Sequence, residues 1–483
     1  MNAEVETRLA HRSLRALMIA AGISTSILYV VVGLISELQM FGDGSIFSYA
    51  VAAQDAWSFH WHNISGRLFT YVFAYLPAEA YVALTKNAKG GIVVYGLLFF
   101  SAQLLGLLAT LAADRTTSRV IFGYACLSTA CLCPLVFGAP TEMWMAHAVF
   151  WPAFAVCLCA PSNLRGAAAV FVALLALLFT HEGAIVFSAA ILFALFLRGW
   201  RDVTFVRALG TFFVVMTIWL IVKMTIRPDD YIAGVLAAAA YKFIDIRNLA
   251  EPAFLSLLTA LAGYAIAAVL LQRVNPARAH AYAAFACAAA LAVYWVWFDR
   301  SLLTEARYNL RTVLLIATPV LGVLAAVHAM HEEGRRKSPL PLLARLARTV
   351  EKSLNPRMIS GAILLTMLVY AVETTKFVWS WIDYKAAVRA LASGTDSDPA
   401  LGDPLFVSSR RIGSGLNRLA WDSTTPYLSV LVAPQLKPTR LVVDPGAGYF
   451  WLSCKTATRS ERTSTAIPAA GRRLVRLHAC LHR

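Results

Sequence analysis

The sequence predicts an all-α polytopic membrane bundle of about 11 transmembrane helices, followed by a small C-terminal α/β domain outside the membrane. Of the 483 residues, 59% are hydrophobic and only 14% are charged, whereas about 25% of a typical soluble chain is charged. The mean hydropathy is +0.63, and apolar stretches long enough to cross a bilayer core recur along the chain. A change of composition near residue 380 predicts the separate domain.

Eleven apolar runs are the predicted spans. They lie near 14–35, 91–112, 119–138, 143–160, 165–180, 183–198, 205–226, 252–272, 279–298, 311–330 and 357–378. The stretch 67–84 is also apolar, but Pro77 and Glu79 in its middle are costly in lipid. Leaving it out puts all basic connections on one side of the membrane, as the positive-inside rule requires. We therefore expect 67–84 to lie on the outer surface, in a first outer loop of residues 36–90 with surface helices.

The basic connections also predict the orientation. The N-terminal segment carries Arg8, Arg12 and Arg15, and the apolar run after it is too long for a signal-peptide core. A retained first helix and an odd number of spans predict a cytoplasmic N-terminus and an extracytoplasmic C-terminal domain. The formal charge of +16 then reflects topology and contact with membrane lipid, not nucleic acid. The expected location is the inner membrane of a bacterium.

Residues 380–483 are predicted to form the outer α/β domain, after a transmembrane domain of residues 1–379. Four strand-like runs alternate with turn residues such as Asp403–Pro404. The runs are PLFVSS, PYLSVLVAP, RLVVDP and YFWLSC. Cys454 and Cys480 are the two cysteines of this domain, and they could form a disulfide in an oxidising compartment.

The predicted topology gathers ionisable residues at the outer membrane face. Asp43 lies in the segment FGDGSIF just after the first apolar run. The residues expected at or near this face are Asp43, Asp55, His60, His62, Arg67, Glu142, His181, Glu182, Asp229, Asp230, Asp299, Arg300, Arg307 and Arg311. Ionisable groups next to lipid are expensive and suggest a functional site. A polar cavity at this level would suit a substrate with an apolar tail and a charged head.

This architecture resembles the C-type superfamily of integral-membrane glycosyltransferases over roughly residues 1–380. The resemblance is carried by one long first helix, an acid near the start of the first outer loop (GDGSIFSYAVAAQDAW), many further spans and an outer C-terminal domain. It implies a polyprenyl-phosphate-linked sugar donor, a glycan or lipid acceptor and inversion at the anomeric carbon. It also implies that Asp43 is the base. Many members carry a second acid directly after the first; here Gly44 stands there, and either Asp55 supplies that carboxylate or one suffices.

Three arginines are candidates for binding the lipid phosphate, because arginine is well shaped for phosphate oxygens. Arg300, Arg307 and Arg311 lie in one outer loop that leads into a predicted helix. The alternative is that they pair with Asp299 and Glu305 or contact lipid headgroups.

The other predicted substrate-binding residues could each have a second role. His181 and Glu182 stand at a tight outer turn, where they could contact sugar hydroxyls, form a metal ligand pair or orient Asp43, or simply solvate a helix end. Glu142 would also suit a helix dipole. The remaining three, which flank or follow the aromatic segment of the first outer loop, are His60, His62 and Arg67. Histidines beside tryptophan are common at a membrane interface.

A divalent cation is used by some members of the superfamily and not by others. Asp43, Asp55 and a histidine could bind one, but no spacing demands it. The sequence contains no phosphate-binding or dinucleotide-binding glycine motif, which counts against a nucleotide-driven pump. The main rival hypothesis is a transporter or flippase of a lipid-linked glycan intermediate, which should place charges near the bilayer midplane. A glycan polymerase or ligase and an assembly protein are two further hypotheses.

Overall fold

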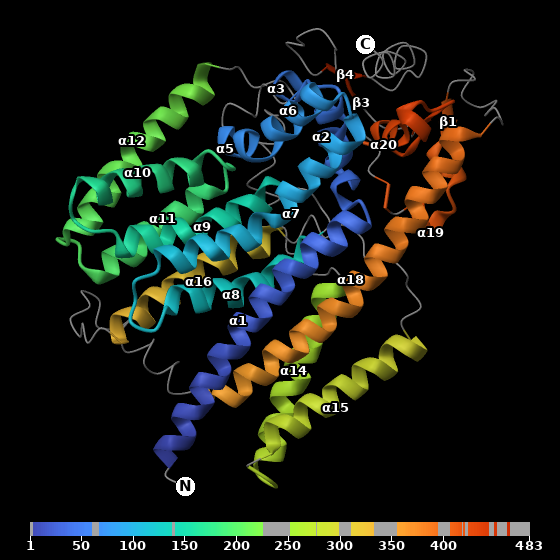
Figure 1. The fold of residues 1–483 in the computed structure, drawn as a ribbon. Helices are drawn as coiled ribbons and strands as arrows, with labels where there is room; N and C mark the ends of the chain where they lie inside the picture. The colour runs from blue at the N-terminus through green and yellow to red at the C-terminus, as the bar shows by residue number, and fades with distance from the viewer. Residues whose placement is uncertain are drawn as a thin grey trace.

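The computed structural model is a bundle of long helices with a small mixed unit at one end (Figure 1). It describes residues 3–59, 67–137, 141–225, 252–276, 278–298, 311–332, 355–394, 406–417, 419–420, 424–443, 449–451 and 461–463. Within these ranges, nine helices are long and apolar enough to cross a membrane, and three shorter apolar helices join them. The prediction of a helical bundle of the multi-pass membrane type is therefore confirmed in outline.

Each of the eleven predicted apolar runs contains a helix. These helices are α1 (Ala3–Ile35), α7 (Ala88–Ala113), α8 (Val120–Leu132), α9 (Glu142–Cys159), α10 (Leu164–Leu178), α11 (Ala184–Arg198), α12 (Val203–Thr225), α14 (Pro252–Gln272), α15 (Ala279–Val293), α16 (Arg311–Glu332) and α18 (Pro356–Ser393). The side chains of Asn87, Asn163 and Asn355 accept hydrogen bonds from first-turn amides of α7, α10 and α18. Such caps satisfy donors that a helix start leaves unpaired.

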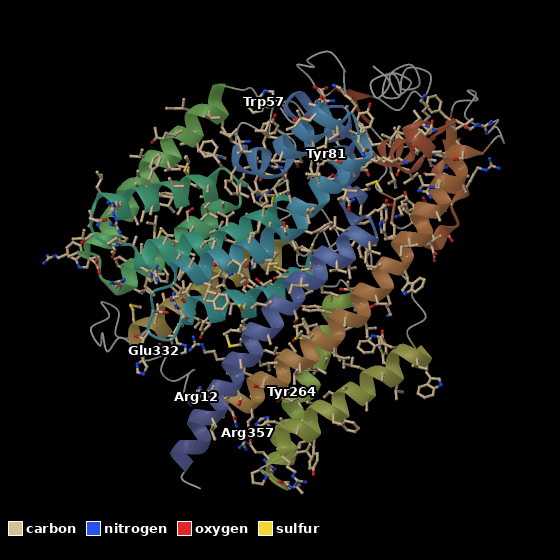
Figure 2. All side chains as sticks on the ribbon, in the orientation of Figure 1. Arg12, Trp57, Tyr81, Tyr264, Glu332 and Arg357 are labelled. Atoms are coloured by element: carbon tan, nitrogen blue, oxygen red, sulfur yellow. The ribbon has the colours of Figure 1, made fainter. Side chains whose placement is uncertain are left out.

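The two ends of the bundle differ. Figure 2 places Arg12 and Arg357 at one end, which we call the Arg12 end, and Trp57 and Tyr81 at the other. The second end carries α2 (Asp43–Ala52), and we call it the α2 end. Short segments near α2 or at the ends of long helices are η1 (Leu38–Met40), α3 (Ala56–Phe59), η3 (Cys133–Leu135) and η5 (Tyr294–Phe298).

Two arginines bind the carbonyl groups that end a helix. Arg198 donates to the Leu158 carbonyl at 2.8 Å, and Arg207 donates to the Ala160 carbonyl at 3.3 Å. Both carbonyls lie at the C-terminal end of α9, where positive charge suits the helix dipole. These arginines therefore tie α11 and α12 to α9.

The stretch 67–84 lies at the α2 end together with α2 and α3 (Figure 1). It forms α5 (Leu68–Thr70), the π-helical η2 (Tyr71–Tyr75) and α6 (Leu76–Thr85). By length and composition it is one of the nine candidate spans. Glu79 is satisfied locally, because its carboxylate accepts hydrogen bonds from the Ala56 amide at 2.7 Å and the Tyr71 hydroxyl at 3.2 Å.

The C-terminal unit combines two small sheets with short helices. Its elements are β1 (Phe406–Ser408), η8 (Ser409–Arg411), α19 (Ser414–Asn417), α20 (Thr425–Val432), η9 (Pro434–Leu436), β2 (Leu441–Val443), β3 (Tyr449–Trp451) and β4 (Glu461–Thr463). Strand β1 pairs with β2 in parallel, so that Phe406 stands opposite Leu441. Strand β3 pairs with β4 in antiparallel fashion. Three of the four predicted strand runs contain β1, β2 and β3.

The fourth strand prediction is wrong, because PYLSVLVAP forms α20. A short apolar run does not distinguish a strand from a buried helix by periodicity, and every residue of α20 is buried. Pro426 stands in the first turn of the helix, where proline is favoured. The parallel pairing of β1 with β2 also needs a crossover connection between them, and α20 lies within that connection.

Helix α18 runs without a break through residue 380, where the outer domain was predicted to begin. The Trp381 indole donates to the Ser36 carbonyl at 2.8 Å. Further along, Arg389 donates to the Val432 carbonyl at 2.8 Å. The same helix therefore fastens the end of α1 and the C-terminal unit to each other, and both lie at the α2 end.

Candidate functional site

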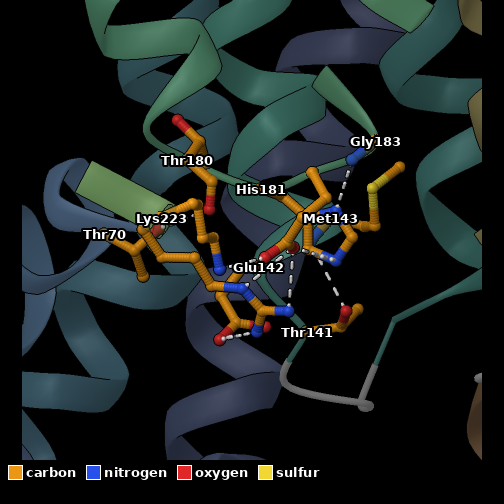
Figure 3. Close-up of polar contacts among 10 residues, drawn as sticks. Thr70, Thr141, Glu142, Met143, Thr180, His181, Gly183 and Lys223 are labelled. Atoms are coloured by element: carbon orange, nitrogen blue, oxygen red, sulfur yellow. Dashed lines mark hydrogen bonds and ion pairs between the residues drawn. The ribbon is translucent and has the colours of Figure 1, made fainter. Parts of the chain in front are cut away.

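Five ionisable side chains meet at the α2 end, and we call them the Arg67 cluster (Figure 3). They are Arg67 before α5, Glu142 at the start of α9, His181 and Glu182 between α10 and α11, and Lys223 in the last turn of α12. Four of them were predicted from the sequence to bind substrate. The structure brings these four together from three distant parts of the chain.

Arg67 lies between the two carboxylates. Its Nη1 donates to Glu142 Oε1 at 2.7 Å, while its Nε and Nη2 donate to Glu182 Oε2 at 3.2 and 3.0 Å. The Lys223 ammonium donates to Oε1 of Glu182 at 2.8 Å, and His181 Nε2 lies 3.9 Å from Oε2. Hydrogen bonds between charged partners are among the strongest in proteins, so this cluster fixes the relative positions of α5, α9, α11 and α12.

Local turns hold the acidic side of the cluster in place. The Thr141 hydroxyl accepts a hydrogen bond from the Met143 amide and caps α9, so that the helix begins at Glu142. An acid in the first turn is favoured by the helix dipole. In the turn before α11, His181 Nδ1 accepts a hydrogen bond from the Gly183 amide at 2.9 Å. This bond orients the other ring nitrogen, Nε2, toward the carboxylate of the neighbouring glutamate.

Arg67 is held by the segment that follows it. The Phe69 amide donates to the Phe179 carbonyl at 3.0 Å, and the Thr70 hydroxyl donates to the Thr180 carbonyl at 3.2 Å. Both acceptors belong to the two residues that directly follow α10, where the chain leaves the helix and backbone carbonyls lack intrahelical partners. The start of α5 is therefore fastened directly to the turn that carries the second glutamate.

The cluster is mostly shielded from water. The exposed fractions of its side chains are 18% for Arg67, 8% for Glu142, 26% for Glu182 and 19% for Lys223. Burial opposes ionisation of Arg67, but the two carboxylates outweigh it and raise the pKa of this guanidinium. Burial likewise opposes ionisation of Glu182, yet Arg67, His181 and Lys223 together hold the pKa of that carboxyl well below its usual range. Both groups are therefore charged at neutral pH.

Asp43 begins α2 at the same end of the bundle. Gly42 precedes it with φ 54° and ψ −129°, a conformation that residues with a Cβ rarely adopt, so glycine is needed where the chain enters α2. The Asp43 side chain is half-buried, and the rest of the helix, Gly44–Ala52, is entirely buried. The carboxylate is thus presented from the first turn of a helix that is enclosed by its neighbours.

Two tyrosines lie near both Asp43 and the Arg67 cluster. The rings of Tyr75 and Tyr95 stack with their centroids 5.3 Å apart. Tyr95 lies within electrostatic range of both Asp43 and Glu142, and Tyr75 lies within range of Glu142 and Arg67. A stacked aromatic pair therefore lies near both charged sites, and sequence reasoning did not single it out.

Asp55 does not lie next to Asp43. Helix α2 has 10 residues, which makes it about 15 Å long; Asp43 begins it and Asp55 follows its end. Asp55 instead lies within electrostatic range of Tyr49 and Glu79. The two carboxylates that the sequence analysis considered together are thus separated by the length of α2.

Several predicted residues lie outside the part of the chain that the structure describes. They are His60, His62, Asp229, Asp230, Asp299, Arg300, Arg307, Cys454 and Cys480. Arg311 is the first residue of α16. The roles expected for these residues, including the grip of three arginines on a phosphate, stay predictions. Within the described ranges, no group of three or more His, Cys, Asp and Glu side chains could hold a metal ion.

Lys223 is the cluster residue that the sequence analysis missed. It lies in the last turn of α12, inside the apolar run 205–226. A lysine within such a run is costly unless it is paired or reaches the interface. That cost was a usable signal, because it predicts an acidic partner for Lys223 and the predicted outer connections contain acids.

Comparisons with protein-family models, with curated proteins and with solved structures found no match. The resemblance to C-type glycosyltransferases therefore depends on the residues and the architecture alone. What the Arg67 cluster and Asp43 do is accordingly argued from their chemistry.

Proposed function

We propose that this protein is an integral-membrane glycosyltransferase that moves a sugar from a polyprenyl-phosphate carrier to an extracytoplasmic glycan or lipid acceptor. One observation carries the proposal: a half-buried aspartate and a cluster containing two cations lie at the same end of an apolar bundle. The Tyr75–Tyr95 pair lies near both. A carboxylate and fixed cations are the two groups that such a transfer needs.

In this reaction, Asp43 acts as the base. The acceptor hydroxyl attacks the anomeric carbon, its proton passes to the Asp43 carboxylate, and the bond from that carbon to the phosphate oxygen breaks with inversion. A positioned base typically contributes about 10²–10⁴-fold to the rate. The departing lipid phosphate gains negative charge, which Arg67 and Lys223 would stabilise from fixed positions.

The proposal includes a topology of eleven spans with the Arg12 end in the cytoplasm. Arg12 and Arg357 at that end agree with the positive-inside rule. The position of residues 67–84 beside α2 supports a surface segment rather than a further span. The α2 end and the C-terminal unit are then extracytoplasmic, in a bacterial inner membrane. A reporter fused after Arg483 should therefore be extracytoplasmic, and a cytoplasmic reporter would contradict this orientation.

The test of function compares wild type with Asp43→Asn, which removes the base but keeps the shape of the side chain. Native mass spectrometry of both proteins should reveal a co-purifying polyprenyl-phosphate sugar, enriched on the variant. Transfer from that lipid to an acceptor should fall by about 10²-fold or more, while the melting temperature stays the same. Asp383→Asn is the matched control, because Asp383 is an exposed aspartate of α18; it should transfer at the wild-type rate.

Two results would count against the proposal. Full transfer by Asp43→Asn would show that another group is the base. Bulk phospholipid alone on both proteins would remove the support for a lipid-linked donor, and transport of a lipid-linked intermediate would then be the function to test.

A further inference from the structure

The carboxylate of Glu182 occupies a site that is built from three basic side chains. Arg67 donates to Glu182 Oε2 through both Nε and Nη2, and Lys223 donates to Oε1 at 2.8 Å. His181 Nε2 lies 3.9 Å from Oε2. The three come from different segments: before α5, the end of α12 and the turn before α11. Three basic groups from separate elements around one anion form the arrangement by which proteins bind phosphate.

The two carboxylates on Arg67 are not equivalent. The Glu142 side chain is 8% exposed and stands in the capped first turn of α9, whereas the Glu182 side chain is 26% exposed. Glu182 also lies in a turn, outside both α10 and α11, so its side chain can rotate away without breaking a helix. Glu142 therefore anchors the guanidinium, while Glu182 can leave it.

A phosphate would use these basic groups better than Glu182 does. A phosphate monoester, such as the polyprenyl phosphate that the proposed transfer releases, brings three free oxygens and nearly two negative charges, whereas one oxygen of the carboxylate already receives two hydrogen bonds from the same guanidinium. The ammonium of Lys223 has three donors, and only one of them is used by Glu182.

We propose that Arg67, His181 and Lys223 form a binding site for a phosphate-bearing ligand, and that the Glu182 carboxylate occupies this site until the ligand displaces it. Only the source of the phosphate, a polyprenyl-phosphate lipid, rests on the proposed function. The site itself would equally accept the phosphate of another lipid headgroup or free phosphate, and the experiment separates a lipid source from free phosphate.

The test removes the resident carboxylate and titrates the full-length protein with inorganic phosphate. A ligand that binds only the folded protein raises its melting temperature in a concentration-dependent way. The melting temperature of Glu182→Ser should rise at a phosphate concentration at least tenfold lower than the one that wild type needs. The double variant Glu182→Ser/Lys223→Gln should lose this response. If the serine variant does not fold, Glu182→Gln keeps the shape of the side chain and should respond in the same direction.

The control removes a different glutamate that pairs with a lysine at the same end. Glu37 is bound by Lys385, and no arginine pairs with it in the part of the chain that the structure describes. Glu37→Ser should therefore not create a phosphate response. An equal response in Glu37→Ser, or no response in either Glu182 variant, would overturn the proposed site.

A second arm identifies the source of the phosphate. If the ligand is a lipid, dodecyl phosphate in detergent micelles should raise the melting temperature of Glu182→Ser at a concentration at least tenfold lower than inorganic phosphate does. Equal potency would assign the site to free phosphate. A phosphate response in a protein that transfers no sugar would keep the site and refute the transferase, whereas transfer without any phosphate response would refute only the site.

Discussion

Two polar clusters connect α9 to its neighbours, and they are built in opposite ways. The Arg67 cluster contains four formal charges and is partly exposed at the α2 end. The second, which we call the His147 cluster, is uncharged and lies inside the bundle. Its members are Gln103 of α7, Ser128 of α8, Cys133 of η3 and His147 of α9.

Every polar group of the His147 ring has a defined partner. Gln103 donates its amide to the Trp144 carbonyl at 2.7 Å, so its Oε1 can only accept. His147 Nδ1 therefore carries a hydrogen and donates to that oxygen at 2.9 Å, while Nε2 accepts from the Ser128 hydroxyl at 2.8 Å. The Cys133 sulfur lies 3.3 Å from Nδ1. The ring is neutral and 0% exposed, which leaves it no means of binding a ligand.

The comparison separates structure from function. A neutral, fully bonded group inside a bundle fixes how three helices meet, because any other packing would leave a polar atom without a partner. A charged cluster at a partly exposed end can exchange one of its members for a ligand of the same charge. Changes in the His147 cluster should thus alter stability alone, and changes in the Arg67 cluster should alter stability and ligand binding together.

The largest expected effect is that of Arg67→Gln. It leaves Glu142 buried without a cation and Glu182 with Lys223 and His181 only, and breaking a buried ion pair in this way costs about 3–5 kcal/mol. The melting temperature in detergent should fall clearly. Arg67→Gln/Glu142→Gln should recover part of the loss, because it removes the uncompensated charge. An unchanged melting temperature in the single variant would show that the cluster does not hold the bundle together.

The next effect is that of His147→Leu. It leaves the Gln103 oxygen and the Ser128 hydroxyl buried without their partner, which costs about 1–3 kcal/mol for each group left unsatisfied. The melting temperature should fall, but Glu182→Ser/His147→Leu should respond to phosphate at the same concentration as Glu182→Ser. A shifted phosphate response would mean that the two clusters are coupled and that the comparison fails.

The sequence predicted at which membrane face residues lie better than it predicted which residues contact one another. Span lengths and basic connections placed Arg67, Glu142, His181 and Glu182 at one face, and the structure brings them into contact. The pairing of Glu182 with Lys223 depends on how α12 is rotated against its neighbours. Hydropathy carries no information about that rotation, since a helix that is apolar all round has no marked face.

The features that the sequence did not predict also depend on how segments pack in space. The separation of Asp55 from Asp43 follows from the ten residues of α2 being helical; the sequence predicted surface helices in this loop but not where each one begins and ends. Residues 426–434 read equally well as a strand or a helix, and only the parallel pairing of β1 with β2 decides between them. The His147 cluster was not predicted, because its members are scattered among apolar residues in separate helices and no spacing connects them.

The smallest expected effect is on the pH dependence of the melting temperature. It tests whether Glu182 is an anion while it is paired with Arg67 and Lys223. Its pKa is held below the unfolded value of about 4.3, so its contribution to stability is complete above that value and is lost as the pH falls through the lowered pKa. The difference in melting temperature between wild type and Glu182→Gln should therefore stay constant from about pH 5.5 to 8 and shrink only in stronger acid. A difference that vanished between about pH 5 and 7 would mean that Glu182 is neutral under ordinary conditions. It would then resemble the His147 cluster and could not stand in for a phosphate.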